Sequence, residues 1–375
     1  MIYLDNAATT YPKPDCVYCA LDHANRNLAF NAGRGSYPEA KAVSDLIAET
    51  RRQVAALVNV PADTVSFEAS ATESLNLIIH GLGLNEGDNV YISPFEHNAV
   101  VRPLHYLKED KKIKIHILPF KKDTWDIDEE KMNNMFALYK PKVCFLSHIS
   151  NVTGYILPTG RIFAAAKEYK AINILDCSQS LGILNPSRDN TDFIVFAGHK
   201  SLYASFGIAG FINLTYQKLK VIKSGGTGSD SLNPEMPAKG YERYEAGSMN
   251  SVALAGLHES LKWLNKTKVL EHEKQLTEYL ISSLRKLDNV RLFLPPDTSH
   301  ILGIVSIGVN GYSSSDAGMI LSEDFGICVR TGYHCAPLIH EFIGSKETGG
   351  TVRISIGAFT KEEDIDRMIN ALGQI

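Results

Sequence analysis

The chain has 375 residues and a formal net charge of −4, with 44% hydrophobic and 21% charged residues. This balance is typical of a globular protein and argues against a disordered or membrane-embedded chain, while the length predicts more than one domain. The lysines are dispersed and form no basic stripe, so nucleic acid is not an expected partner. Since no apolar run reaches the length of a membrane span, we expect a cytoplasmic protein that binds small molecules and no membrane.

The cysteines indicate a reducing environment. They are Cys16, Cys19, Cys144, Cys177, Cys328 and Cys335. Because Met1–Asp5 lacks the features of a secretion signal, we expect reduced thiols and not disulfides. Cys16 and Cys19 form a CxxC, but no second pair follows at zinc spacing, so we predict no metal site.

Strands and helices are predicted to alternate over the first two thirds of the chain. A strand at 2–4 precedes a turn-rich segment, a helix beginning near residue 15 and an amphipathic helix over 36–57. Strands are then expected at 65–67, 89–92, 113–118, 143–147, 173–175 and 193–196, with helices beginning near residues 72, 99 and 161. This alternation predicts a mostly parallel sheet covered on both faces, in which ligands bind beyond the carboxyl ends of the strands.

The pattern changes near residue 250. Long, charged helices are expected over 251–287, followed by strands at 290–293, 301–307 and 352–355 among helices. These elements predict a small α+β domain at the C-terminus. We therefore expect an N-terminal segment (1–15) that packs with the small domain, a large domain (16–255) and the small domain itself (256–375).

The strand at 193–196 leads into Gly198-His199-Lys200, and this lysine is the first candidate for chemistry. A lysine that a buried strand delivers into a tight turn is poorly solvated, which favours the neutral, nucleophilic amine. Such an amine can form a Schiff base, although most lysines that leave a sheet simply reach solvent. The residues at the other strand ends decide between these two interpretations.

The other strand ends carry groups that suit pyridoxal phosphate. Ser70-Ala71-Thr72-Glu73 opens a helix whose free N–H groups can bind a phosphate. His97 can stack on a flat ring, and Asn151 offers an amide. Asp176 ends a strand with a carboxylate that a protonated pyridine nitrogen would pair with. Each motif alone is also ordinary capping or turn chemistry, so the prediction rests on their combination with Lys200.

The sequence resembles the class V aminotransferase family of fold type I pyridoxal phosphate enzymes, and within it the cysteine desulfurase and selenocysteine lyase group. The matching stretches occur in order along the whole chain: Leu4-Asp5-Asn6-Ala7-Ala8-Thr9-Thr10, Gly33-Arg34-Gly35, Ala71-Thr72-Glu73, Glu96-His97-Asn98-Ala99, Ser150-Asn151-Val152-Thr153-Gly154, Asp176 with Gln179, Gly198-His199-Lys200, Gly225-Gly226-Thr227-Gly228, Glu245-Ala246-Gly247-Ser248, Arg330-Thr331-Gly332-Tyr333-His334-Cys335-Ala336 and Val352-Arg353-Ile354-Ser355. The resemblance implies the fold type I architecture: an α/β large domain with a mostly parallel seven-stranded sheet and a small α+β C-terminal domain.

The resemblance also implies which residues form the site. Those expected to bind pyridoxal 5'-phosphate are Ala71, Thr72, His97, Asp176, Gln179, His199, Lys200 and Thr227. Those expected to hold the substrate are Asn151, Arg330 and Arg353, and those expected to be catalytic are Lys200, Cys335 and His97.

In this scheme Lys200 holds the cofactor as a Schiff base, and Asp176 pairs with the pyridine nitrogen. Gln179 bonds the phenolic oxygen, while His97 stacks on the ring and assists proton transfer. Thr227 would reach the phosphate of the neighbouring subunit in a homodimer. One departure concerns Ala197, because relatives often carry serine at this position as a phosphate donor. We expect a modest loss of cofactor affinity from this change.

Cys335 is the residue that discriminates between reactions. Nearby Arg330 and His334 are expected to favour its thiolate, which is the form that attacks sulfur. The resemblance implies a cysteine desulfurase that converts L-cysteine to L-alanine and carries the sulfur as a persulfide on Cys335. The sulfur would pass to an acceptor protein, for example in iron–sulfur cluster assembly.

The sequence is also compatible with three alternative functions. Selenocysteine lyase would use the same residues, and in another class V reaction, such as transamination, Cys335 would be incidental. A sulfur carrier that has lost turnover is the third, and the presence of Lys200, Asp176, Arg353 and Cys335 together argues against it.

Overall fold

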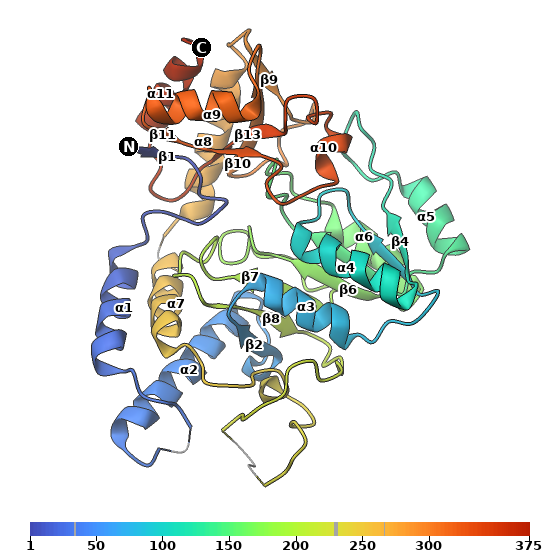
Figure 1. Cartoon of the computed structure of the whole chain (residues 1–375), viewed down its shortest axis with the longest axis vertical. Helices are drawn as coiled ribbons and strands as arrows, with labels where there is room; N and C mark the ends of the chain where they lie inside the picture. Colours follow the sequence, from blue (N-terminus) through green and yellow to red (C-terminus); the bar gives the residue numbers. More distant parts are fainter. Residues whose placement is uncertain (34, 229–231, 266) are drawn as a thin grey trace.

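The computed structural model describes residues 1–33, 35–228, 232–265 and 267–375. Figure 1 shows a larger part built on one sheet and a smaller part that contains both ends of the chain. The large sheet has seven strands in the order β2 (Val65–Glu68), β8 (Ala209–Asn213), β7 (Phe193–Ala197), β6 (Ile172–Asp176), β5 (Val143–Ser147), β3 (Asn89–Ile92) and β4 (Lys114–Ile117). Among these strands β8 alone runs opposite to the other six, which confirms the expected mostly parallel sheet.

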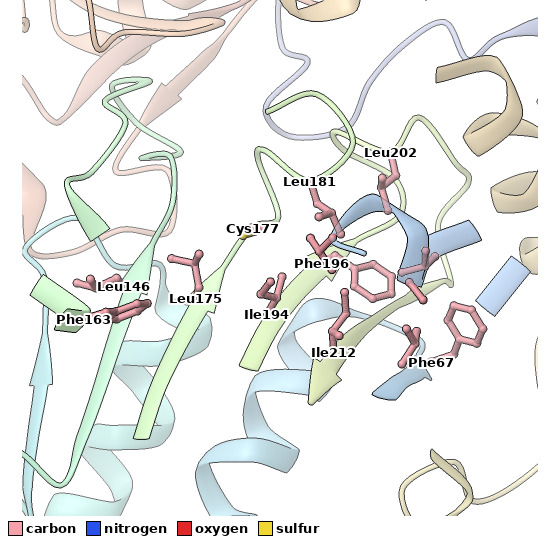
Figure 2. Packing of buried hydrophobic residues seen from close by; sticks show 14 of the residues in the cluster. Phe67, Leu146, Phe163, Leu175, Cys177, Leu181, Ile194, Phe196, Leu202 and Ile212 are labelled. Carbon is pink, nitrogen blue, oxygen red and sulfur yellow. The ribbon is translucent and has the colours of Figure 1, made fainter. Parts of the chain in front are cut away.

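Both faces of this sheet are covered, which explains why its central strands are apolar throughout. Every residue of β7 is buried, with Ile194 and Phe196 on one face and Phe193 and Val195 on the other. Successive side chains of a strand point to opposite faces, so a strand buried on both sides needs a continuous apolar run. Figure 2 shows the first of these faces, where Ile194 and Phe196 lie near Leu175 of β6 and Ile212 of β8.

Within the described residues, seven α-helices belong to the larger part. They are α1 (Asp15–Asn27), α2 (Pro38–Leu57), α3 (Ala71–Gly81), α4 (Asn98–Lys111), α5 (Glu129–Leu138), α6 (Thr159–Glu168) and α7 (Ser251–Leu264), with single 3₁₀ turns at η1 (Ala62–Thr64) and η2 (Tyr241–Arg243). Helices α1 and α7 lie side by side (Figure 1), and Gly256 permits their close approach because a Cβ there would lie 3.0 Å from Leu21.

The smaller part is built on an antiparallel sheet in the order β12 (Arg330–Gly332), β13 (Thr351–Ser355), β10 (Ile304–Val309) and β9 (Val290–Leu292). Its helices are α8 (Val269–Leu284), α9 (Ser314–Glu323), α10 (Ile339–Phe342) and α11 (Glu362–Leu372). Strand β1 (Ile2–Tyr3) pairs in parallel with β11 (Ile327–Cys328), so the start of the chain joins this part. In the part of the chain that the structure describes, no helix combines the length and apolarity that crossing a membrane requires.

Candidate active site

The predicted site residues meet because five strands of the large sheet end at the same edge. Strands β3, β5, β6 and β7 are parallel. Asp176 is the last residue of β6, and the loops that follow β3, β5 and β7 carry His97, Asn151 and Lys200. Strand β2 also points this way, because two antiparallel steps through β8 restore its direction, and Ser70 follows it. The result is a pocket of about 240 Å³ lined by all five of these residues.

Lys200 reaches this pocket through a tight turn after β7. Gly198 is required in the turn, since a Cβ there would lie 2.5 Å from the carbonyl oxygen of Ile208. Burial lowers the pKa of Lys200, and the opposing charge of Asp176 reduces that shift. Its Nζ makes no hydrogen bond within the described residues, so Lys200 presents an unengaged amino group to the pocket. These properties fit the nucleophilic lysine that the sequence predicts.

His97 is neutral at physiological pH, and its proton can be placed. The residue caps α4, where its Nδ1 accepts a hydrogen bond of 3.0 Å from the backbone N–H of Ala99. An accepting Nδ1 puts the ring proton on Nε2. Burial and the nearby charge of Lys200 lower the pKa of His97 to about 4. The pocket therefore contains an uncharged imidazole that can donate from Nε2.

Asp176 and Gln179 also line the pocket. Asp176 Oδ1 accepts hydrogen bonds from the backbone N–H and the hydroxyl of Ser178, at 2.9 and 2.5 Å. No described residue bonds its Oδ2, so one carboxylate oxygen is available to a ligand. Gln179 donates from Nε2 to the carbonyl oxygen of Ala7 at 2.9 Å, which ties this part of the lining to the N-terminal segment.

The start of α3 and His199 form another part of the lining. Ser70 caps the helix by accepting from Glu73 N at 3.1 Å, and the N–H groups of Ala71 and Thr72 at the first turn have no acceptor among the described residues. His199 stacks on Phe206 at 4.6 Å, and its Nδ1 is buried without a partner among the described residues. Burial lowers the pKa of His199 to about 3, so its ring is neutral.

Glu96 is a buried residue for which the sequence predicted no role, although it lies in the Glu96-His97-Asn98-Ala99 motif. Its carboxyl accepts from Ser93 Oγ at 2.5 Å, from Ser147 N at 2.8 Å and from Ser147 Oγ at 3.0 Å. These bonds join the ends of β3 and β5 directly before His97. Burial raises the pKa of Glu96 to about 8, with nearby Asp176 acting in the same direction. Glu96 therefore holds the turn that carries His97 while remaining protonated at neutral pH.

Replacing Glu96 with glutamine is expected to flatten the pH dependence of stability between about pH 4.5 and 8. In this window the folded carboxyl keeps a proton that an unfolded glutamate loses, so the parent's stability falls as the pH rises. The amide does not titrate. The free energy of unfolding of Glu96→Gln minus that of the parent should therefore be larger at pH 8 than at pH 5. Denaturant unfolding at both pH values measures this, with the exposed Glu86→Gln as control. A difference that does not change with pH would contradict a protonated Glu96.

The N-terminal segment also contacts the site, which the sequence did not reveal. The carbonyl oxygen of His199 accepts from Thr10 N at 3.1 Å, Thr9 Oγ1 at 3.0 Å and Lys13 Nζ at 2.8 Å. Burial lowers the pKa of Lys13 to about 7, and no carboxylate among the described residues pairs with it. Residues 5–13 therefore pack against the turn that carries Lys200.

Asp5 holds both of the arginines predicted to bind substrate. Arg353 is buried, with 2% of its side chain exposed; its Nη2 donates to Asp5 Oδ1 and its Nη1 to the carbonyl oxygen of Asn151, both at 2.8 Å. Its Nε is buried without a partner in the described chain. Arg330, opposite Arg353 on β12, donates from Nε to Asp5 Oδ2 at 3.0 Å. Both guanidinium groups lie beside the Lys200 pocket but outside its lining.

Cys335 lies next to the site on a strained turn. Both His334 and Cys335 have positive φ, at 46° and 56°. The Cys335 carbonyl oxygen accepts from Asn98 N at 2.6 Å, and that of His334 accepts from Asn151 Nδ2 at 2.7 Å. The turn is thus fixed to the loops that carry His97 and Asn151. Its thiol is exposed and lines a separate cavity of about 800 Å³.

The expectation that His334 supplies positive charge to Cys335 is wrong. Burial lowers the pKa of His334 to about 2, so the ring is neutral. Its Nε2 lies 2.8 Å from Thr351 Oγ1 and is therefore engaged in the small sheet. Arg330, the other expected charge, is paired with Asp5.

Thr227 is the one predicted cofactor residue that this chain does not bring to the pocket. It lines another hollow, of about 730 Å³, together with Gly226 and Gly228. Arg34, in the Gly33-Arg34-Gly35 motif, lies outside the described residues.

The aminotransferase class-V family model matches residues 2–368, nearly the whole chain. The chain belongs to the class-V aminotransferase family. A probable cysteine desulfurase from Vibrio cholerae is 30% identical over 397 residues, which cover 99% of this chain and 93% of that protein. One from Methanothermobacter thermautotrophicus is 28% identical over 388 residues, covering 100% and 94%. The apo structure of the cysteine desulfurase from Thermococcus onnurineus NA1 superposes with a TM-score of 0.92 at 25% identity, covering 100% and 94%.

Membership of the class-V aminotransferase family confirms the resemblance found in the sequence, and the match to solved cysteine desulfurases confirms the α/β fold. Several relatives and structural neighbours bear the name cysteine desulfurase.

Proposed function

We propose that this chain is a pyridoxal phosphate-dependent cysteine desulfurase, which converts L-cysteine to L-alanine and transfers the sulfur to Cys335. The observation that carries the proposal is the joining of Cys335 to the Lys200 pocket. Asn98, next to His97, and Asn151 each bond the backbone of the Cys335 turn. A transaminase has no use for an exposed thiol fixed in this place, whereas sulfur transfer requires one.

The Lys200 pocket fits pyridoxal phosphate. The free N–H groups of Ala71 and Thr72 and the unpartnered Nδ1 of His199 would serve the phosphate. Asp176 Oδ2 would pair with the pyridine nitrogen, and no described residue competes for the amino group of Lys200. The bound cofactor supplies an electron sink that stabilises negative charge on the substrate's Cα. Since Ala197 adds no hydroxyl to the lining, the phosphate would depend more on the α3 terminus, His199 and Thr227.

The residues of the chain supply binding and proton transfer. Arg353 has a free Nε and can receive the substrate carboxylate, with Asn151 beside it. Lys200, whose pKa is lowered by burial, would take the proton from Cα. His97 would donate from Nε2, since its Nδ1 already accepts from Ala99.

The transfer of sulfur to the thiol of Cys335 needs no added oxidant or reductant. Its thiolate attacks the substrate sulfur, and an S–S bond forms as the substrate's Cβ–S bond breaks. The electron pair of that bond stays on the carbon side and takes up a proton, so the product is alanine. Cys335 is left as a persulfide, which an acceptor must discharge before the next turnover.

We also propose the domain and subunit organisation that the sequence indicated. Residues 16–255 would form the cofactor domain and 256–375 the small domain, with 1–15 packed against the small domain through β1 and Asp5. This boundary falls inside α7, whose remaining turns pack with α1 and α2 of the larger part. In a homodimer, Thr227 of a second copy would complete the phosphate site, because within one chain Thr227 lines the 730 Å³ hollow and not the Lys200 pocket. Cytoplasmic location stays a prediction.

The experiment that tests this function supplies L-cysteine and a reducing thiol to the holoenzyme and measures alanine and sulfide. Equal amounts of both are expected. Amino transfer to pyruvate without sulfide would overturn the proposal in favour of a transaminase. Turnover of selenocysteine with only marginal turnover of cysteine would identify a selenocysteine lyase.

Replacing Cys335 with alanine is expected to lower sulfide release from L-cysteine at least about 100-fold, because the nucleophile that accepts the sulfur is lost. Cys328→Ala is the matched control, since Cys328 is a partly exposed thiol on the neighbouring strand β11. That variant should keep the parental rate. Parental sulfide release by Cys335→Ala would show that no persulfide forms at this position.

A further inference from the structure

The cavity of about 800 Å³ next to Cys335 is separate from the Lys200 pocket. One wall comes from α4, with Val101, Arg102, His105 and Tyr106, and the other from the segment that carries Cys335. Cys335 lines this cavity and is absent from the lining of the Lys200 pocket. A sulfur atom held on its thiol is therefore accessible from a hollow that a ligand can enter without displacing the cofactor.

The charges on the cavity wall favour an anion. Arg102, His105 and Lys346 line it, and no aspartate or glutamate does so among the described residues. Lys346 is paired with Glu341 at 3.0 Å, whereas Arg102 makes no hydrogen bond or ion pair within the described chain. An arginine without a partner offers its fork of donors to a carboxylate.

The size and the remaining lining favour a small molecule. A volume of about 800 Å³ lies in the range of small-ligand pockets. Tyr106 and Tyr333, which are 71% and 50% exposed, give the wall large apolar surfaces. A ligand that fits has a short apolar stem and a carboxylate, and chemistry at Cys335 requires that it also carry a thiol.

We propose that this cavity binds a small anionic thiol, which takes the sulfur directly from Cys335. The proposal rests on the proposed desulfurase function. The acceptor thiolate attacks the outer sulfur of the Cys335 persulfide and forms a new S–S bond. The bond between that sulfur and Cys335 Sγ breaks, and Cys335 leaves as a thiolate. The product is the persulfide of the small thiol, and the step needs no further oxidant or reductant.

The charge of the acceptor thiol provides the test. The holoenzyme is given L-cysteine with 3-mercaptopropionate, which is anionic, or with cysteamine, which is cationic and of similar size. For each protein, the kcat/KM for 3-mercaptopropionate is divided by the kcat/KM for cysteamine, and this ratio is compared between the parent and Arg102→Gln. We expect this ratio to fall about tenfold in the variant, because a charged hydrogen bond to the carboxylate is lost. Comparing ratios cancels the intrinsic reactivities of the two thiols.

Lys108→Gln is the matched control, because it removes one positive charge from the same helix outside the cavity lining. It should leave the ratio unchanged. Added salt should weaken the parent's preference for the anionic thiol.

A single-turnover measurement separates this proposal from the function on which it rests. Without any thiol acceptor, the parent and Arg102→Gln should both form about one alanine per subunit. Absence of alanine in the parent overturns the desulfurase function and this inference with it. If alanine forms but the ratio of kcat/KM values for the two thiols is the same in the parent and Arg102→Gln, the inference alone is overturned. The sulfur would then pass to the cysteine of an acceptor protein.

Discussion

Replacing Lys200 with alanine should abolish both the cofactor's absorbance band near roughly 420 nm and turnover of L-cysteine, with a loss of at least about 1,000-fold in rate. Lys200 is the only amine in the lining of the 240 Å³ pocket, among the residues that the structure describes. The variant therefore loses the group that would anchor the cofactor and the group that would accept the Cα proton. Absorbance after incubation with pyridoxal phosphate, with and without borohydride, measures the first loss.

The apoprotein of Lys200→Ala should be at least as stable as the parent. Because burial lowers the pKa of Lys200, the folded state resists the charge that the unfolded lysine carries. Below the ordinary pKa of lysine this opposes folding, and alanine removes the penalty. Lys170→Ala, an exposed lysine before β6, is the control and should keep the band and the activity. A folded Lys200→Ala that retained a band sensitive to borohydride would move the anchor to another lysine.

The strands of the large sheet could be predicted wherever burial on both faces required a continuous apolar run. Residues 143–147 and 193–196 are examples, since every residue of β5 and β7 is buried. Strand β8 was not predicted, because Gly210 interrupts its apolar pattern. The structure gives the reason for this glycine: a Cβ there would lie 2.2 Å from the carbonyl oxygen of Ser66. The close pairing of β2 with β8 thus removes the sequence signal that would have revealed the strand.

The chemical groups of the site were predictable, but their connections were not. Lys200 and His97 each follow a strand and Asp176 ends one. Because parallel strands end at one edge, the meeting of these residues follows from the topology. Asp5 lies 348 positions before Arg353, and only the folded chain brings the two together. No local spacing encodes such a contact.

The error over His334 has a similar origin. Its place next to Cys335 in the sequence indicated a charged neighbour for the thiol. The positive φ of both residues instead accompanies a turn in which the imidazole is buried against Thr351. Burial lowers the pKa of His334, so the ring carries no positive charge that could stabilise the thiolate of Cys335.

Replacing Asp5 with asparagine should weaken substrate binding and destabilise the fold together. Asp5 is the carboxylate that pairs with Arg353, whose side chain is 2% exposed, and it also holds Arg330. Loss of one partner of a buried ion pair typically costs about 3–5 kcal/mol, because a charge is left without compensation. With its orientation no longer fixed, Arg353 should bind the substrate carboxylate less well. We expect KM for L-cysteine to rise about tenfold while kcat changes less.

Asp126→Asn is the matched control for this prediction. Asp126 also pairs with an arginine, Arg161, but both side chains are about half exposed, at 44% and 50%. Exposed pairs contribute about 0–1 kcal/mol, so this variant should unfold near the parental temperature and keep the parental KM. Thermal unfolding and steady-state kinetics of the three proteins decide the matter. If Asp5→Asn matched the control in both measurements, Arg353 would have to be held by Asn151 alone, and the N-terminal segment would have no part in positioning the substrate.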